Sequence, residues 1–404
     1  MEKPIWVGSE TGRLRRVLLH RPGAEMEQLT PQLMNELLFD DIPWVEGMRR
    51  EHDAFAQALR QEGCEVVYLE DMLEQVLAQG QVAAEFVDEL LSRWICRDKQ
   101  STAYLRQRLL QLSPAQLVEC ACSGLPLQEG DFGPGSLSCY LQQEHNYLLS
   151  PLPNLYFTRD LGTVIGDSMI LCAMNTPARR REAALLATIV RHHSDFAHID
   201  LLYDNASCHM PLEGGDVLVL SDRVIAVGCS QRTSAAAVDY LAQRFLADDE
   251  QGQRRLLVVG IPEQRACMHL DTVMTMVDAD CFIYYPWFLE SATLVEISAG
   301  SKGSLNYRVH DNLEGALASV LGLGAVELIK SGEGNSVSAA REQWNDAANT
   351  LCVAPRKVIV YNRNDVSNRA LRAHGVETIE IEGSELVRGR GGPHCMSLPL
   401  LRDR

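Results

Sequence analysis

Apolar and polar positions along the chain fall into short blocks that predict strands and helices in turn. Apolar runs at residues 14–21 and 64–69 predict two strands, and apolar residues at helical spacing over 43–59 predict a helix between them. Pro22 and Gly23 mark the end of the first block. This part of the chain is therefore expected to form a strand–helix–strand unit.

The pattern changes between residues 70 and 128. Leu, Ala, Glu and Gln dominate there, apolar residues recur at helical spacing, and no strand pattern appears. We expect several short helices that form an insertion. A Gly-, Pro- and Ser-rich stretch at 130–138 predicts a loop after it.

Strand and helix patterns alternate again further along the chain. The expected strands and helices are a hairpin at 163–173, a helix at 177–192, strands at 216–220 and 224–228, a helix at 233–246, a strand at 255–261, strands at 351–354 and 358–361, a helix at 365–374 and a strand at 376–381. The order strand–strand–helix–strand recurs, which favours an α/β fold of similar units arranged radially. A doubly wound sheet is the alternative, because it also alternates strands and helices.

Composition and charge narrow the functional classes. The 404 residues are 46% hydrophobic and 23% charged, as in globular proteins, with a formal net charge of −17. Such an acidic chain is a poor partner for nucleic acid or anionic membranes. No signal peptide and no apolar run of about 18 residues is visible. Twelve scattered cysteines favour free thiols in a reducing compartment, so we expect a cytoplasmic protein.

Several common sites are missing from the sequence. It contains no phosphate-binding GxxxxGK[ST] loop, no convincing dinucleotide loop and no HExxH zinc motif. Cys120 and Cys122 are one residue apart, and Cys208-His209 has no second pair at ligand spacing. We therefore expect neither a metal nor a cofactor.

Polar residues with chemical potential gather instead in a few short segments. These segments are Asn154 to Asp160, Glu213 to Asp216, His269 to Asp271, Asn345-Asp346 and Arg388 to Cys395.

His269 and Asp271 would project to the same side if residues 268–276 form a strand, because side chains two apart share a face. A surface strand of alternating polarity gives the same pattern. Glu213, followed by two glycines, and Asp160, after an aromatic run, could equally mark a hairpin and a strand end.

Cys395 follows a basic, glycine-rich stretch that contains Arg388, Arg390 and His394. Neighbouring positive charge lowers a thiol pKa, which makes Cys395 a candidate nucleophile. A small buried hydrophobic residue is the alternative, since that is the usual place of cysteine.

Together the segments offer a thiol, a histidine and three carboxylates. Carboxylates that share a site need a cation to offset their repulsion. A guanidinium fits this requirement, because it is a planar cation that pairs bidentately with carboxylates. The residues therefore point to attack of a thiolate on a guanidinium carbon.

At these residues the sequence resembles the arginine deiminases over nearly the whole chain. The resemblance rests on these motifs: SETGRLRRV from Ser9, LLFDD ending at Asp41, FTRD ending at Asp160, EGGD from Glu213, QRTS from Gln231, MHLDTV from Met268, Asn345-Asp346 and RGRGGPHCM from Arg388. It implies a pentein fold, a five-bladed α/β propeller of ββαβ units, as one domain over residues 1–404 with the helical insertion at 70–128. It implies hydrolysis of L-arginine to L-citrulline and ammonia, without cofactor, in a homo-oligomer, either a dimer or a tetramer.

The resemblance also assigns roles to the catalytic residues. The nucleophile falls on Cys395 and the general acid/base on His269. Asp160 and Asp271 match the carboxylates that hold the guanidinium, and Glu213 matches the carboxylate beside the histidine.

Substrate-binding positions follow in the same way. Arg179 and Arg232 match arginines that hold the substrate carboxylate, and Asn154 matches a further binding residue. Arg390 matches an arginine of a mobile loop, and Asp41 matches a carboxylate that interacts with it.

One position departs from the family, since Pro393 stands where glycine is expected, and proline restricts the backbone. Related enzymes of the superfamily transfer the amidino group, hydrolyse methylated arginines or convert arginine to ornithine. Other pentein proteins bind the ribosome, for which a thiol, a histidine and three carboxylates have no use.

Overall fold

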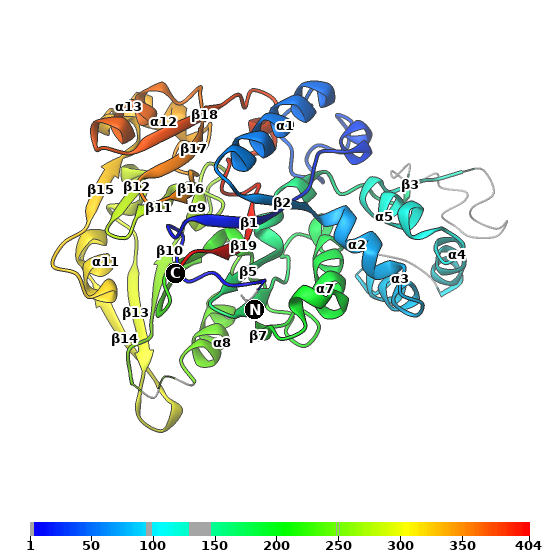
Figure 1. Cartoon of the computed structure of the whole chain (residues 1–404), viewed down its shortest axis with the longest axis horizontal. Helices are drawn as coiled ribbons and strands as arrows, with labels where there is room; N and C mark the ends of the chain where they lie inside the picture. Colours follow the sequence, from blue (N-terminus) through cyan, green and yellow to red (C-terminus); the bar gives the residue numbers. More distant parts are fainter. Residues whose placement is uncertain (1–3, 94–98, 129–146, 248, 250) are drawn as a thin grey trace.

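The computed structural model describes residues 4–93, 99–128, 147–247, 249 and 251–404. The predicted loop at 130–138 lies outside these residues. The described chain is α/β, and its strands form several small sheets with helices on their outer sides (Figure 1).

One three-stranded sheet illustrates the arrangement. Its strands are β5 (Gly162–Ile165), β6 (Ser168–Leu171) and β7 (Asp200–Tyr203). The central strand β6 runs antiparallel to β5 and parallel to β7. Helix α7 (Glu182–His192) makes the crossover between the two parallel strands, as a parallel connection requires.

The same order recurs in other sheets. In each, the central strand is antiparallel to the first strand and parallel to the third. The strands are β8 (Val217–Ser221), β9 (Val224–Cys229) and β10 (Arg255–Gly260); β11 (Met274–Asp278), β12 (Cys281–Tyr284) and β15 (Glu327–Lys330); β16 (Leu351–Ala354), β17 (Lys357–Tyr361) and β18 (Glu377–Ile381); and β19 (Leu398–Arg402), β1 (Leu14–Leu19) and β2 (Glu65–Tyr68). The crossover helices are α8 (Ala235–Phe245), α11 (Leu313–Leu321), α13 (Asp365–Ala373) and α1 (Val45–Gln61).

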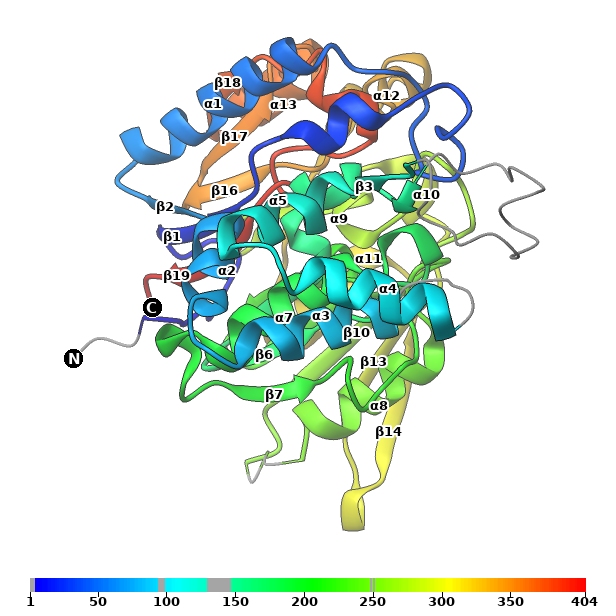
Figure 2. The ribbon, with the colours of Figure 1, turned by 90° about the vertical axis from the view of Figure 1, so that its right-hand side faces the viewer.

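The recurring order argues against the doubly wound alternative, because the strands in the described part of the chain form separate mixed sheets and do not join into one parallel sheet. One sheet is extended by a hairpin of β13 (Leu294–Ala299) and β14 (Leu305–His310), which pairs with β10. This hairpin projects from the body in Figure 2.

Local sequence accounts for the elements at these positions. Strand β9 is an unbroken apolar run and is buried almost throughout, as expected for a strand covered on both faces. Helix α8 begins after Ser234, whose side chain accepts a hydrogen bond from the Ala237 amide. The helix expected at 177–192 is divided, with a 3-10 turn at Pro177–Arg179 followed by α7.

The predicted insertion is helical. It contains α2 (Leu69–Leu77), α3 (Val82–Ser92), α4 (Lys99–Leu109) and α5 (Pro114–Ser123). These helices form a lobe on one side of the molecule (Figures 1 and 2). Helices α2 and α3 pack against α7, which is buried on nearly all sides.

Short helical segments precede several first strands and carry residues of interest. They are the 3-10 turns η3 (Thr158–Leu161) and η6 (Gly214–Asp216) and the short helix α9 (Leu270–Val273).

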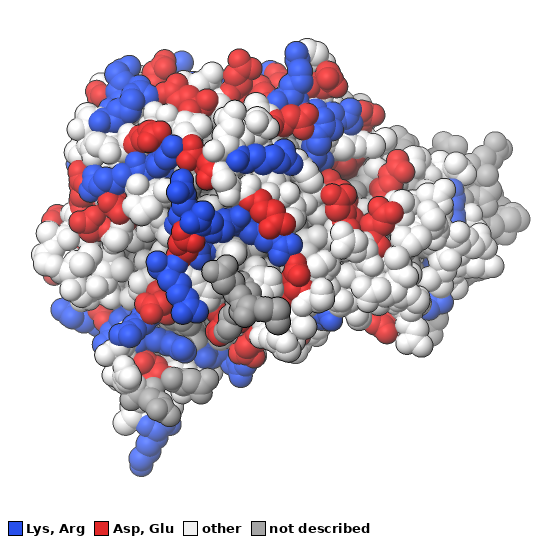
Figure 3. All heavy atoms as spheres, viewed as in Figure 1, with Lys and Arg blue, Asp and Glu red and all other residues white. Residues whose placement is uncertain are grey.

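The distribution of surface charge and the state of the cysteines agree with what the composition predicts. Acidic and basic side chains are interspersed on the face seen in Figure 3. Every cysteine in the described part of the chain is a free thiol. Among the described helices, none is both long enough and apolar enough to cross a membrane.

Candidate active site

The polar segments singled out in the sequence occupy equivalent places in the fold. Each lies immediately before the first strand of a different sheet, namely β5, β8, β11, β16 and β19. Asp160 lies on η3, Glu213 precedes η6, and Cys395 lies in the turn before β19. Equivalent entry segments of different sheets therefore bring side chains far apart in sequence to one place.

The segment at His269 differs from the predicted strand. Residues 270–273 form the short helix α9, and the strand begins only at Met274. The Thr272 hydroxyl donates to the His269 carbonyl oxygen at 2.7 Å, which closes this turn. Because the turn is helical, Asp271 points toward Cys395 while His269 points toward Glu213.

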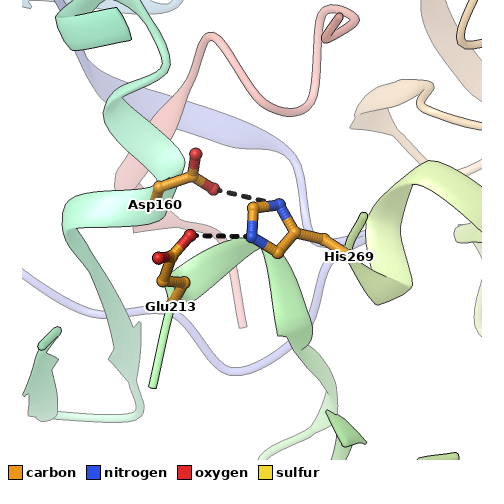
Figure 4. A group of neighbouring side chains, drawn as sticks. All are labelled: Asp160, Glu213 and His269. Carbon is orange, nitrogen blue, oxygen red and sulfur yellow. Dashed lines mark hydrogen bonds and ion pairs between the residues drawn. The ribbon is translucent and has the colours of Figure 1, made fainter. Parts of the chain in front are cut away.

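His269 lies between two carboxylates (Figure 4). Its Nε2 is 2.9 Å from Oε2 of Glu213, and its Nδ1 is 3.6 Å from Oδ1 of Asp160. Burial alone would lower the pKa of His269, but the charge of Asp160 and the hydrogen bond to Glu213 outweigh burial and raise the pKa to about 9. His269 is thus a cationic acid at neutral pH.

Glu213 is fixed from three sides. It accepts hydrogen bonds from the Asn175 amide at 3.0 Å and from Arg232 at 3.3 Å, besides its contact with His269. Burial opposes its ionisation, yet the charge of Arg232 and the hydrogen bond to His269 lower the pKa of Glu213 to about 2. Glu213 therefore remains an anion next to the histidine.

Gly215 leaves the space in which His269 and Asp160 approach each other. A Cβ atom at this position would lie 2.7 Å from Nδ1 of His269 and 2.8 Å from Oδ1 of Asp160. The requirement for glycine is steric, because any side chain would enter the gap between the imidazole and the carboxylate.

Arg179 is bonded to two acidic residues. Its Nη1 donates to Oδ2 of Asp160 at 2.5 Å, and its Nε and Nη2 donate to Glu182 at 3.0 and 2.8 Å. Of the three consecutive arginines, Arg180 is exposed, and Arg181 is buried and donates to the Ser150 carbonyl oxygen. Arg179 is thus the arginine of this run that contacts Asp160.

The thiol of Cys395 is buried and contacts a carboxylate. Its Sγ lies 3.3 Å from Oδ2 of Asp271 and 3.0 Å from Nδ2 of Asn349. Burial raises the pKa of the Cys395 thiol well above its usual value, and the charges of Asp271 and Asp160 raise it further.

This result corrects the expectation that the basic segment before Cys395 lowers its pKa. Arg388 pairs with Asp41 and Glu385 near the surface. Arg390, with φ of 69°, places its guanidinium 3.6 Å from the ring centre of Trp344. The charge of Arg390 acts on Asp346, but neither arginine is paired with Asp271 or Asp160, the carboxylates that raise the pKa of the thiol most.

Asp41 also differs from its expected role, because its ion pair is with Arg388 and not with Arg390. The left-handed backbone of Arg390 turns that side chain away, toward Trp344. Asn154 lies at the site, where its side-chain amide donates to the Leu37 carbonyl oxygen at 2.7 Å.

A small cavity of about 20 Å³ joins these groups. A volume of this size holds about one water molecule, so larger ligands require movement of its walls. The lining residues are Leu38, Asn154, Phe157, Asp160, Arg179, Arg232, Met268, His269, Gly389, Arg390 and Cys395.

Sequence reasoning missed several polar residues of the site. Asn349 contacts Cys395 twice, since its Oδ1 also accepts from the Cys395 amide at 3.0 Å. Glu182 holds Arg179. Asp346, which the sequence did single out, is buried, and burial raises its pKa to about 7. The proximity of Asn349 to the flagged pair at 345–346 was the one available signal.

Asp160, Glu213 and His269 are the group among the described residues whose spacing suits a metal ion. Asp160 and Glu213 are already bonded to Arg179 and Arg232. Any further cation at this group must therefore share or displace these arginines.

Solved structures of similar fold include an amidinotransferase and an arginine dihydrolase. An amidinotransferase from Microseira wollei aligns with a TM-score of 0.58 at 15% identity, covering 99% of this chain and 97% of the other. The N-terminal domain of a cyanobacterial arginine dihydrolase aligns with a TM-score of 0.54 at 14% identity, covering 96% and 98%. At this identity the likeness concerns the fold.

Sequence comparison is more specific. The family model described as arginine deiminase matches residues 35–402. Arginine deiminase of Latilactobacillus sakei is 40% identical over 409 residues, covering 100% of both chains. That of Bacillus cereus (strain B4264) is 42% identical over 408 residues, covering 100% of this chain and 99% of the other. Together with a thiol, a histidine and three carboxylates in one buried site, these matches show that the chain belongs to the arginine deiminase family.

Proposed function

We propose that this protein hydrolyses L-arginine to L-citrulline and ammonia and serves arginine catabolism. The observation that carries the proposal is the convergence of Cys395, His269, Asp160, Asp271 and Glu213 on one buried site. Buried carboxylate oxygens of Asp160 and Asp271 that lack a hydrogen-bond partner favour a cationic ligand. Family membership supports arginine as that ligand.

Substrate binding uses both ends of arginine. Asp160 and Asp271 hold the guanidinium, and Arg179, Arg232 and Asn154 hold the α-carboxylate end. The buried Oδ1 atoms of Asp160 and Asp271 make no hydrogen bond to protein atoms, so each is available to a guanidinium N–H. A grip at both ends fixes the reacting carbon relative to the thiol.

The substrate itself promotes ionisation of the nucleophile. The Cys395 thiol has a raised pKa because it is buried beside carboxylates. A guanidinium bound between them brings a positive charge next to the sulfur and so favours the thiolate. Attack is thereby coupled to the presence of the correct cation.

The chemistry then proceeds in two stages. The thiolate sulfur bonds to the guanidinium carbon, His269 gives a proton to one terminal nitrogen, and ammonia leaves as its C–N bond breaks. A thiouronium intermediate remains on Cys395. Water, deprotonated by His269, adds to the same carbon. The C–S bond then breaks to regenerate the thiolate, and the added hydroxyl releases its proton to the ammonia or to solvent as it becomes the carbonyl of citrulline.

The fold proposal is that the repeated units close into a five-bladed ring around this site. Its support is the recurring strand order of the sheets and the common placement of site segments before their first strands. We further propose one catalytic domain over residues 1–404, in which 70–128 is an insertion.

Two further expectations belong to this proposal. We propose that the protein is cytoplasmic and that it assembles as a homo-oligomer, either a dimer or a tetramer. Free cysteines and the net charge of −17 are compatible with a reducing compartment and with a protein that does not bind nucleic acid. Sedimentation of the purified protein measures its assembly, and a monomer at micromolar concentration would contradict the oligomer.

The deciding experiment is incubation of the purified protein with L-arginine, followed by identification of the products. Citrulline with one equivalent of ammonia supports the proposal, whereas ornithine or a transferred amidino group would assign a different reaction. Cys395→Ser is the control and should lose activity by more than about a thousandfold while it remains folded. Substantial activity in this variant would refute the nucleophile assignment.

His269→Ala separates the two proposed uses of the histidine. Loss of both stages predicts no covalent adduct on Cys395 in intact-mass measurements after addition of arginine. Accumulation of the adduct would restrict His269 to the second stage.

A further inference from the structure

A buried ion network lies directly behind the candidate site and has no part in the reaction proposed above. Its central residue is Glu10, which is 2% exposed. We propose that Glu10 is a positioning residue that acts through His394 to hold Asp271 and to favour ionisation of the Cys395 thiol. This inference rests on the proposed function, because it assigns Asp271 and Cys395 the roles given there.

Glu10 is held rigidly by strand β8. Its backbone amide donates to the Val219 carbonyl oxygen at 2.7 Å, and its own Oε1 accepts from the Val219 amide at 3.3 Å. The same Oε1 accepts from Nη1 of Arg159 at 3.4 Å. The second oxygen, Oε2, is thereby aimed at His394.

His394 connects Glu10 to the site. Its Nε2 lies 3.3 Å from Oε2 of Glu10, and its Nδ1 lies 2.8 Å from Oδ2 of Asp271. Ionised carboxylates only accept hydrogen bonds, so both ring nitrogens must donate. The geometry therefore favours the imidazolium form of His394, with one carboxylate on each side.

Oδ2 of Asp271 is shared by two donors. His394 donates to it from one side, and the Cys395 thiol lies 3.3 Å from it on the other. Burial raises the pKa of Asp271, but the hydrogen bond and charge of His394 outweigh burial and keep it below its usual value. The strength of the His394 contact therefore sets how much negative charge Asp271 presents to the thiol.

Other charges face this network and must be considered. Arg159 and Arg402 lie behind Glu10, with Nη2 of Arg402 at 3.9 Å from Oε2. On the side of the candidate site, the charges of Asp160 and Asp346 also raise the pKa of the Cys395 thiol. The charge of Arg159 lowers the pKa of both Glu10 and Asp271. His394 is hydrogen-bonded to both carboxylates, so it provides the direct path for an effect of Glu10 on Asp271.

The substitution Glu10→Gln removes the negative charge of residue 10 but keeps the size and shape of its side chain. Glutamine fills the same space, its oxygen can still accept from Arg159, and its amide can donate to Nε2 of a neutral His394. Every contact can thus be kept while the charge that favours the imidazolium is lost. The imidazolium form of His394 then has a carboxylate on one side only, so the charge of Asp271 is less well compensated beside the thiol.

The measurement is the rate of alkylation of Cys395 by iodoacetamide at several pH values, followed on the peptide that contains Cys395 by mass spectrometry. Without substrate, the pH dependence of this rate reports the thiolate fraction, whereas its absolute value also reflects access of the reagent to the buried thiol. Below the midpoint, Glu10→Gln should lower the rate about tenfold at a given pH, equivalent to a rise of the midpoint by about one unit. If His394 did not connect Glu10 to Asp271, loss of the negative charge of Glu10 would instead move the midpoint of Cys395 alkylation to lower pH.

The sign of the shift is therefore decisive. An unchanged or lowered midpoint in folded Glu10→Gln protein would overturn the proposal. His394→Asn places an amide donor near the position of Nδ1 but removes the imidazolium, and it should raise the midpoint as well. In the His394→Asn background, Glu10→Gln should produce no further rise, because coupled residues are not additive.

Folding of each variant is checked by circular dichroism and thermal unfolding. If Glu10→Gln does not fold, the His394→Asn variant alone tests the proposal. An unchanged midpoint of Cys395 alkylation in that variant rejects the proposed connection from Glu10 through His394 to Asp271. If neither folds, the network serves only stability and the proposal is rejected. Failure of this proposal can be told apart from failure of the proposed function. The proposed function fails if the wild-type protein releases no citrulline from arginine, whatever the alkylation midpoints are.

Discussion

Arg179 donates a hydrogen bond of 2.5 Å to Asp160, so a protein guanidinium is bonded to a carboxylate that the family resemblance assigns to the substrate guanidinium. The two cations present the same donors to the same acceptor. The adjoining cavity measures only about 20 Å³, so entry of arginine requires that side chains of its wall change place. We expect Arg179 to leave Asp160 and turn to the substrate carboxylate.

Arg179→Lys tests this exchange. A lysine keeps the charge but cannot bridge Asp160 and Glu182 with a planar fork, and it cannot bind a carboxylate bidentately. We expect kcat/KM for arginine to fall by about ten- to a hundredfold, mainly through KM, in citrulline-release assays. Arg180→Lys is the matched control, because Arg180 is exposed, and it should stay within about twofold of wild type. Equal values for both variants would contradict the assignment.

Glu213→Gln should change the pH dependence of turnover. The pKa of His269 is about 9 because Asp160 and Glu213 outweigh the opposing effect of burial. Removal of the Glu213 charge lowers the pKa of His269, so the protonated acid is lost at lower pH. The alkaline limb of kcat should move down by about one pH unit, while the neutral amide keeps the space filled. An unmoved alkaline limb would show that protonated His269 does not limit turnover.

Gly215→Ala should impair catalysis without unfolding the protein. The added methyl group would lie 2.7 Å from His269 and 2.8 Å from Asp160, so one of them must shift. A displacement of about 1 Å at a catalytic group can cost about a hundredfold in rate. Gly324→Ala is the control, because a Cβ atom there meets nothing within 4 Å. Wild-type kcat in Gly215→Ala would mean that this spacing is not needed.

His52 makes the fold sensitive to acid at a place remote from the chemistry. It is fully buried on α1, and neither ring nitrogen has a hydrogen-bond partner. Burial, with a smaller contribution from His20, lowers the pKa of His52 to about 3. The unfolded chain binds this proton near pH 6.5 and the folded chain does not, so stability is lost as the pH falls from about 6.5 toward 3.

His52→Leu removes that titration. The drop in unfolding free energy between pH 7 and pH 4.5 should be smaller than in wild type by about 2 kcal/mol. Denaturant unfolding at both pH values measures this difference and cancels changes in packing. His198→Gln, at an exposed histidine, should leave the drop unchanged. An identical drop in His52→Leu and wild type would refute the burial argument.

Much of the fold was predictable because the evidence for it is local. The strand at 14–21 and the helix at 43–59 correspond closely to β1 and α1. The described residues between 70 and 123 are mainly helical, and the short strand β3 (Leu125–Pro126), which was not expected, follows them. Periodicity cannot tell which strands share a sheet, since pairing depends on contacts between distant segments. It also misjudged residues 268–276, where a Thr272 side-chain contact closes a helical turn before the strand.

The candidate site, like the fold, could be predicted where the evidence is local and not where it depends on contacts between distant segments. Short segments with polar residues where a buried core would not place them revealed which parts of the chain matter. The raised pKa of Cys395 could not be foreseen from its basic neighbours. The directions of Arg388 and Arg390 are set by Asp41 and Trp344, which lie far away in the sequence.

The pairing of β19 with β1 has a consequence for how activity is acquired. Leu398 and Leu18 are paired partners in this antiparallel ladder, and Cys395 lies only three residues before that contact. Closure of so long a loop is entropically slow, so contacts of this kind tend to form late in folding. During refolding from denaturant, secondary structure should return first, and citrulline production should be among the last properties to recover.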